Sequence, residues 1–147
     1  MASRKSQILT KIVSILETLI PADIKTVNYQ VIKIADGDFE EWELPAIQLI
    51  DQGEIVEHEQ GRARKTWDIV LEILLKTTVA GQVNQQTMFD LQNLVERKLW
   101  ENPQIGIPGV IDLKYNNSAT DLHLLSPLYY CRMDFTVRYY DALVSDC

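Results

Sequence analysis

The sequence of 147 residues is poor in the side chains that build metal and disulfide sites, with two histidines and two cysteines. Neither His58 nor His123 has a second histidine or a cysteine at the spacing of a zinc site, so we expect no metal centre. Cys131 lies in an apparent strand, and Cys147 is the last residue. Two cysteines so placed make a poor disulfide framework, and the sequence predicts two free thiols.

The sequence also lacks the motifs of catalysis and nucleotide binding. No serine stands in a G-x-S-x-G nucleophile elbow. Gly106 and Gly109 lie in a segment flanked by Pro103 and containing Pro108, and they precede an apparent strand, whereas a phosphate-binding glycine loop precedes a helix. The triplet from Asp36 to Asp38 does not fit the twelve-residue pattern of a calcium loop, which ends in a glutamate. We therefore expect no catalytic residue and no cofactor, and a solvated loop around Asp36.

Long apolar runs are missing too. No segment reaches the roughly 20 apolar residues that a membrane span requires. The stretch from Ile8 to Ile20 is interrupted by Lys11 and Glu17, and no small-residue cleavage site follows it, so it predicts an amphipathic helix rather than a signal peptide. We expect a protein that stays in the cytoplasm of the cell that makes it and has no membrane contact.

Acidic residues, in contrast, are plentiful, and the formal net charge is −7. A run of them lies between positions 36 and 43: Asp36, Asp38, Glu40, Glu41 and Glu43. Such a field repels phosphate backbones, which argues against a sequence-independent grip on DNA, although DNA can still slide past an acidic surface. The 46% of hydrophobic residues predicts a packed core, and the length is that of one domain spanning residues 1–147.

The hydrophobic periodicity of the first half predicts one helix and three strands. Apolar residues recur at helical spacing over 6–20, with Ser3 or Ser6 as the N-cap and Pro21 as the stop. Alternation predicts strands over 26–34, 46–50 and 64–77 around an acidic loop at 36–43, and residues 54–59 can continue the second strand beyond Gly53. The second and third strands form a long hairpin with its tip near residues 60–62.

The second half predicts a helix and two or three further strands. The helix follows Gly81 and ends at Asn102 and Pro103. A strand over 110–115 precedes a turn at Asn116 and Asn117, and residues 122–125 can pair back. The last strand shows the clearest alternation, from Tyr129 to Tyr139. This order favours an α+β fold with a mainly antiparallel sheet, a long hairpin and helices packed on one face.

Charges of both signs gather on the predicted hairpin. The first strand of the hairpin carries Glu54, Glu57 and Glu59, and the second begins with Arg62, Arg64 and Lys65. Two interpretations stay open: a cross-strand ladder of ion pairs within the subunit, or a projecting arm whose charges select a partner.

The last strand offers a second group of candidate interface residues. Arg132 and Arg138 accompany four tyrosines: Tyr129, Tyr130, Tyr139 and Tyr140. Tyrosine and arginine are enriched in the centres of protein interfaces, but buried tyrosines of a core follow the same alternation. The sequence leaves both possibilities open.

The order of these features resembles that of phage tail terminator proteins, which are also called tail completion or tube-capping proteins. The features are the N-terminal amphipathic helix, the Leu44-Pro45-Ala46-Ile47 start of a strand, the glutamate-then-arginine hairpin, the Leu91–Leu99 helix and the closing Phe135-Thr136-Val137-Arg138-Tyr139 strand. The resemblance extends over nearly the whole chain and rests on element order rather than on a diagnostic motif.

The resemblance implies a non-enzymatic structural subunit of a virion, assembled in the host cytoplasm. Such proteins form a ring, typically a hexamer, that caps the tail tube, stops its growth and offers a surface to the head-to-tail connector. In contractile particles the ring also anchors the sheath protein. DNA then passes the lumen without specific binding, and the hairpin from Glu54 to Lys65 is a contact with another subunit or with the tube.

Other classes of protein fit the same residues. Within the structural class, the alternatives are another neck or connector protein and a tube subunit, which stacks without limit. A small ligand-binding domain or enzyme requires Asp36, Asp38, His58 and His123 to converge on a pocket. A nuclease-like or DNA-binding module requires salt-sensitive binding to DNA, which the net charge disfavours.

Overall fold

The computed structural model of the chain describes residues 3–20, 22, 24–29, 44–76, 85–101, 106–121 and 128–142. Its elements are α1 (Arg4–Glu17), β1 (Thr26–Asn28), β2 (Ala46–Glu59), β3 (Arg62–Lys76), α2 (Gln85–Trp100), β4 (Val110–Asp121) and β5 (Leu128–Ala142). Several sequence-based expectations lie outside the described residues: the strand end at 30–34, the acidic loop at 36–43, the helix stops at Pro21 and Pro103, the strand at 122–125, His123 and Cys147.

The strands form a five-stranded sheet in the order β1-β2-β3-β5-β4. Neighbouring strands are antiparallel except β1 and β2, which run parallel with Thr26 beside Ala46. Strand β3 is the centre of the sheet, because it pairs with β5 along its whole length, from Arg62 beside Ala142 to Lys76 beside Leu128. The predicted α+β fold with a mainly antiparallel sheet is therefore confirmed.

Helix α1 starts two residues earlier than the periodicity predicts, because Ser3 caps it. The Ser3 Oγ accepts a hydrogen bond from the backbone N–H of Ser6 at 3.1 Å, which satisfies one of the free amides of the first turn. The predicted apolar stripe of α1 then faces inward: Ile8, Ile12, Val13, Ile15 and Leu16 are buried. In α2 the buried stripe is Met88, Leu91, Val95 and Leu99.

Both helices pack against the same face of the sheet in one core cluster. The sheet contributes alternate residues to it, namely Trp67, Ile69, Leu71, Ile73 and Leu75 from β3 and Cys131, Met133, Phe135, Val137 and Tyr139 from β5. The predicted placement of the helices on one face and the alternation of the last strand are confirmed. Tyr139 is fully buried, so this tyrosine belongs to the core and not to an exposed interface.

A short polar row lies on the opposite face of the sheet, across β1, β2 and β3. Gln48 is fully buried there; its side-chain oxygen accepts a hydrogen bond from the Asn28 amide at 2.6 Å, and its amide donates to Glu72 at 3.1 Å. A buried amide with both of its ends paired favours one register of the three strands, because a slip of one residue leaves polar groups unsatisfied.

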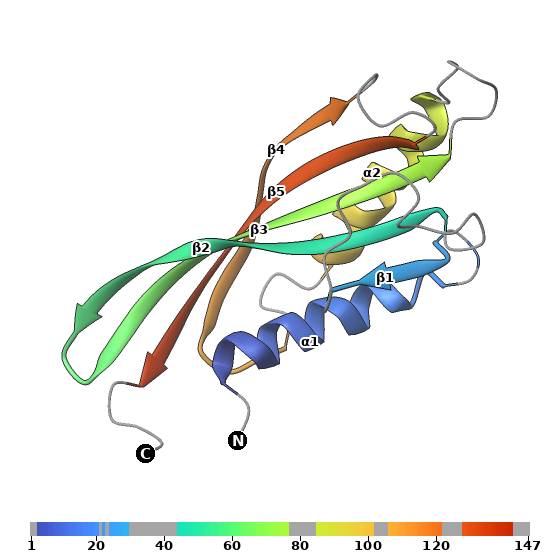
Figure 1. Cartoon of the computed structure of the whole chain (residues 1–147). Helices are drawn as coiled ribbons and strands as arrows, with labels where there is room; N and C mark the ends of the chain where they lie inside the picture. The colour runs from blue at the N-terminus through green and yellow to red at the C-terminus, as the bar shows by residue number, and fades with distance from the viewer. Residues whose placement is uncertain are drawn as a thin grey trace.

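The hairpin formed by β2 and β3 is longer than the rest of the sheet. Strand β2 continues past Gly53 as one strand, with a β-bulge between Asp51 and Glu54. Gly53 has a φ of +94°, which only glycine adopts readily, and it thereby lets the strand continue on the far side of the bulge. The chain reverses at Gln60 and Gly61, as predicted. This end of the hairpin and the C-terminal end of β5 extend beyond the first turn of α1 (Figure 1).

Strand β4 corrects one prediction. The expected turn at Asn116 and Asn117 is wrong, because β4 continues to Asp121 and has only a bulge between Tyr115 and Asn117. Side-chain contacts keep β4 paired with β5 at this point. The Asn116 amide donates to the Thr136 hydroxyl at 2.6 Å, and the ring of Tyr115 stacks on that of Phe135. The bulge accommodates one extra residue in β4, so that the strand continues where a turn would have reversed the chain.

Candidate interaction surface

The long hairpin projects from the body of the molecule as an arm, which we define as residues 54–67 of β2 and β3 together with residues 137–142 of β5. Strand β4 first meets β5 where Val110 pairs with Tyr139, and β1 pairs only with residues 46–48 of β2. The outer part of the arm therefore consists of three strands. One of its faces continues the helix-covered side of the sheet, and we call the other its outer face.

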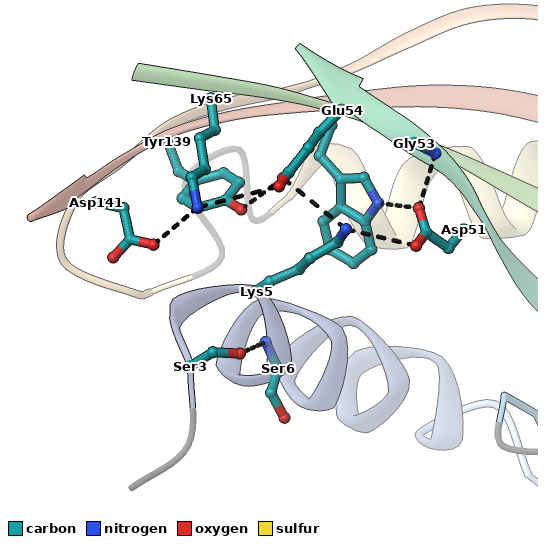
Figure 2. Close-up of polar contacts among 10 residues, drawn as sticks. Ser3, Lys5, Ser6, Asp51, Gly53, Glu54, Lys65, Tyr139 and Asp141 are labelled. Carbon is teal, nitrogen blue, oxygen red and sulfur yellow. Dashed lines mark hydrogen bonds and ion pairs between the residues drawn. The ribbon is translucent and has the colours of Figure 1, made fainter. Parts of the chain in front are cut away.

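A row of alternating charges joins the arm to α1 on the helix-covered side (Figure 2). The Nζ of Lys5 lies 3.4 Å from Asp51 and 3.9 Å from Glu54, and the Nζ of Lys65 lies 3.2 Å from Asp141 and 4.0 Å from Glu54. We call these five residues, together with Tyr139, the arm root. Because its carboxylates and ammonium groups alternate, each carboxylate except Asp141 at the end of the row has a second polar partner.

The carboxylate of Asp51 fixes the bulge at the base of the arm. Its Oδ1 accepts hydrogen bonds from the backbone N–H of Gly53 and from the indole of Trp67, both at 2.8 Å. The pKa of Asp51 is lowered chiefly by the Gly53 amide, and the Trp67 indole and Lys5 lower it further against the opposing effect of burial. Lys5 also lies over the Trp67 ring, 4.9 Å from its centroid. Helix α1 is thus connected to the bulge through both charge and ring contacts.

Tyr139 brings a hydroxyl from the core to the same network. The hydroxyl donates to Glu54 Oε2 at 3.0 Å. Burial raises the pKa of Tyr139 above its ordinary value, and the hydrogen bond and negative charge of Glu54 raise it further. The side chain is therefore a neutral donor to Glu54 at physiological pH. The hydrogen bond joins β5 to β2 beside the two lysines of the arm root.

The outer face of the arm carries the remaining predicted hairpin charges. Glu57 pairs with Arg64 at 2.5 Å, and Glu59 pairs with Arg62 at 3.2 Å. The Glu57 carboxylate raises the pKa of Arg64. The guanidinium of Arg62 also lies over the Tyr140 ring, 3.8 Å from its centroid. The predicted cross-strand ladder is present, and because all four charged side chains are at least one-third exposed, they can also meet a partner.

Apolar side chains stand exposed among these charges. Ile55 is 65% exposed on the outer face, and Val56 is 41% exposed on the helix-covered side. Adjacent positions of a strand point to opposite faces, so each side of the arm presents one apolar contact. Singly exposed apolar residues are ordinary on protein surfaces, so Ile55 and Val56 indicate an interface only if a partner covers them.

Arg132 and Arg138, the two arginines predicted on the last strand, lie away from the tip of the arm and toward the body of the sheet. Arg138 holds Asp112 of β4 through two nitrogens, with its Nε 2.8 Å from the carboxylate. Arg132 contacts Asp134, two residues farther along β5, at 3.0 Å. Strand pairing places both arginines on the sheet face that carries Arg62 and Arg64. The predicted set thus divides into an outer-face group and the arm-root pair of Glu54 and Lys65.

Sequence analysis missed a second exposed apolar region on α2. Phe89 is 52% and Trp100 is 73% exposed, and eleven positions of a helix are about three turns, so both lie along the same side. That spacing is a signal that the sequence does contain. Beside Trp100 lies a hollow of about 290 Å³, lined by Glu96, Leu99, Trp100, Leu113, Lys114, Tyr115 and Phe135. We call it the Trp100 groove.

Of the four residues that a ligand pocket would require, the structure describes His58 alone. His58 is exposed on the arm, and Asp36, Asp38 and His123 lie outside the described residues. Cys131 is buried as a free thiol and accepts a hydrogen bond from the Gln92 amide. In the part of the chain that the structure describes, no group of three or more His, Cys, Asp or Glu side chains is arranged to hold a metal ion. None of the described helices is long and apolar enough to cross a membrane.

Comparison with known proteins yields a match in structure alone. No family of known sequences matches the chain, and no curated protein is significantly similar to it. Among solved structures, a chain of the virion of a native gene transfer agent (GTA) particle aligns with a TM-score of 0.63 at 11% identity. This chain shares its fold with a virion chain. The alignment covers 95% of this chain and 96% of the other, so neither has a large part that the other lacks.

Proposed function

We propose that this chain is a structural virion protein of a phage-like particle, in which it forms a ring that caps the tail tube. The observation that carries the proposal is the end-to-end likeness to a chain of a GTA virion particle. The order of helices, strands and charged hairpin, which resembles that of tail terminator proteins, supports the same assignment. The ring ends tube growth, anchors a sheath protein where one is present, and joins the tail to the head connector.

The geometry of the arm suits a role in assembly. A closed ring requires two different, complementary patches on each subunit, since each copy contacts one neighbour on either side. The outer face of the arm supplies one such patch, with Glu57, Glu59, Arg62 and Arg64 around Ile55. The arm root holds this patch in place relative to the body. Arg132 and Arg138 extend the same face toward the body.

The overall charge suits a channel through which DNA passes. The sequence carries a net charge of −7 with a pI near 4.8. A negative lumen keeps phosphates hydrated and mobile, whereas a basic lumen would bind them in a salt-dependent manner. In this proposal the protein is assembled in the host cytoplasm and remains in the tail or neck of the virion, without catalytic activity.

Electron microscopy and native mass spectrometry of the purified protein test the proposal. We expect closed rings, with six copies as the leading stoichiometry, that bind one end of tubes made by the tube protein of the same particle. Addition of the rings to polymerising tube protein should limit tube length. Extended tubes of this chain alone would instead identify a tube subunit, and a monomer that leaves tube growth unchanged would refute the ring.

A further inference from the structure

Two consecutive cations in the first turn of α1, Arg4 and Lys5, contact the two edges of the three-stranded arm. Lys5 lies against β2, and Arg4 holds the turn at residues 107–110, which is hydrogen-bonded to β5. We infer that these two residues form an electrostatic clamp that holds the arm in one pose, and that the arm loosens when their charges are removed or screened. The clamp acts within one subunit, so it does not depend on the proposed ring.

Lys5 forms the β2 side of the clamp. Its Nζ lies between two carboxylates on either side of the bulge, 3.4 Å from Asp51 and 3.9 Å from Glu54 (Figure 2). The same ammonium group lies over the Trp67 ring, which is almost fully buried. Asp51 also accepts the hydrogen bond of the Gly53 amide, so the charge of Lys5 supports the carboxylate that fixes the bulge.

Arg4 forms the β5 side of the clamp. Its Nη1 donates a hydrogen bond to the carbonyl oxygen of Pro108, in the turn that leads into β4. The carbonyl oxygen of the next residue, Gly109, accepts a hydrogen bond from the backbone N–H of Tyr140 at 2.9 Å. The turn is therefore enclosed between the helix and the arm. Glycine permits this close approach, because a Cβ at position 109 would lie 3.2 Å from Nη1 of Arg4 and 3.3 Å from the carbonyl oxygen of Tyr140.

The contacts of the clamp are weaker than the strand pairing of the arm. The side chains of Lys5 and Asp51 are 32% and 57% exposed, so water and salt reach their ion pair and weaken it. Strand β3, in contrast, pairs with β5 without a break from Lys76 in the body to Arg62 at the end of the arm. Opening of the clamp therefore loosens the arm at both edges, while the arm remains attached and the body remains folded.

Amide hydrogen exchange followed by NMR tests the clamp, one side at a time. Lys5→Met removes the charge and keeps an unbranched side chain over the Trp67 ring, so the amide of Gly53 should exchange about three- to tenfold faster than in the wild type. Arg4→Met should have the same effect on the amide of Tyr140, which donates to the turn that Arg4 holds. Exchange at residues 69–73, in the middle of β3, should stay unchanged in both variants.

Lys11→Met is the matched control for the β2 side. Lys11 is an exposed residue of the same helix, and its replacement removes the same charge outside the clamp. Exchange at Gly53 should therefore equal that of the wild type. If Lys5→Met and Arg4→Met also exchange like the wild type, the strands alone hold the arm, and the clamp is overturned. Equal acceleration at residues 69–73 would overturn it too, because the two cations would then stabilise the whole subunit.

Salt tests whether the clamp is electrostatic. An increase from about 0.1 M to about 1 M ionic strength shortens the screening length from about 10 Å to about 3 Å. In the wild type this increase should accelerate exchange at Gly53 toward the rate of Lys5→Met, and in Lys5→Met it should have little further effect. Equal acceleration by salt in both proteins would overturn the ion pairs of Lys5 as the cause. Rings or monomers in the same samples bear on the proposed function alone.

Discussion

The body of the sheet and the arm share the same strands, yet different interactions hold them. In the body, alternate residues such as Leu71 and Met133 lie beneath α1 and α2 and have almost no exposed surface. In the arm, Val56 on the same face and Ile55 on the outer face are both exposed to water. The base of the arm still reaches the core through Trp67, Val137 and Tyr139, and beyond it ion pairs between neighbouring strands become the main side-chain contacts.

The contrast between the buried body and the exposed arm separates the interactions that stabilise the subunit from the surface that is available to a partner. Burial of apolar area is the main source of folding free energy, and most of the buried apolar side chains lie in the body. The part of the arm beyond Trp67 and Tyr139 contributes little apolar burial, and its position depends on strand pairing with β5 and on Lys5 of α1. A surface held rigidly but left uncovered is suited to binding, because a partner has little ordering entropy to overcome.

The largest effect should come from a truncation in the body. Leu71→Ala removes a side chain that is 1% exposed at the centre of β3, and we expect a loss of about 2–5 kcal/mol in the free energy of unfolding. Ile55→Ala, on the arm, should stay within about 0.5 kcal/mol of the wild type. Urea unfolding followed by circular dichroism measures both. Equal losses would mean that the arm has a covered core of its own.

A smaller effect is expected where the arm meets the body. Tyr139→Phe deletes the hydroxyl that donates to Glu54 and keeps the buried ring, so the cost should be about 1–2 kcal/mol, below the value for a lost core side chain. The matched control is Tyr140→Phe, whose ring lies beneath Arg62 at the surface and which should be close to neutral.

The same variant has a distinct dependence on pH. Because the pKa of Tyr139 is raised in the folded protein, the folded state holds this proton more tightly than the unfolded chain does. The contribution to stability is complete below the ordinary tyrosine pKa of about 10 and is lost as the pH rises beyond it. Thermal unfolding measured from about pH 8 to about pH 11 spans the ordinary tyrosine pKa of about 10. Over this range the unfolding temperature of Tyr139→Phe should decline less steeply than that of the wild type. Parallel declines would show that Tyr139 does not titrate differently in the two states.

The parts of the fold that depend on neighbouring positions in the sequence were predictable. The apolar stripes of α1 and α2 and the alternation of β5 each indicate which face is buried, because burial favours an apolar residue at each individual position. The turn at Asn116 was predicted wrongly because asparagine suits both turns and bulges. Thr136 and Phe135, about twenty residues farther along the chain, decide between the two in the folded molecule.

The candidate surface was predictable only in part, for the same physical reason. The charges of the hairpin are adjacent once a hairpin is assumed, so their pairing followed from the sequence. The arm root did not follow, since Lys5 and Asp51 are 46 positions apart and nothing local connects them. Tyr139 looked equally suited to core and interface, and only the packing of both helices beneath β5 assigns it to the core.

The smallest effect should be found at the exposed charges of the arm. Arg64→Gln removes a single, partly exposed ion pair with Glu57, and we expect the urea midpoint to stay unchanged within experimental error. Arg138→Gln provides the comparison, because Arg138 joins β4 to β5 through two contacts with Asp112, and its loss should lower the midpoint measurably. If Arg64→Gln proves the more damaging of the two, the charges of the outer face stabilise the subunit, and their assignment to a partner loses its basis.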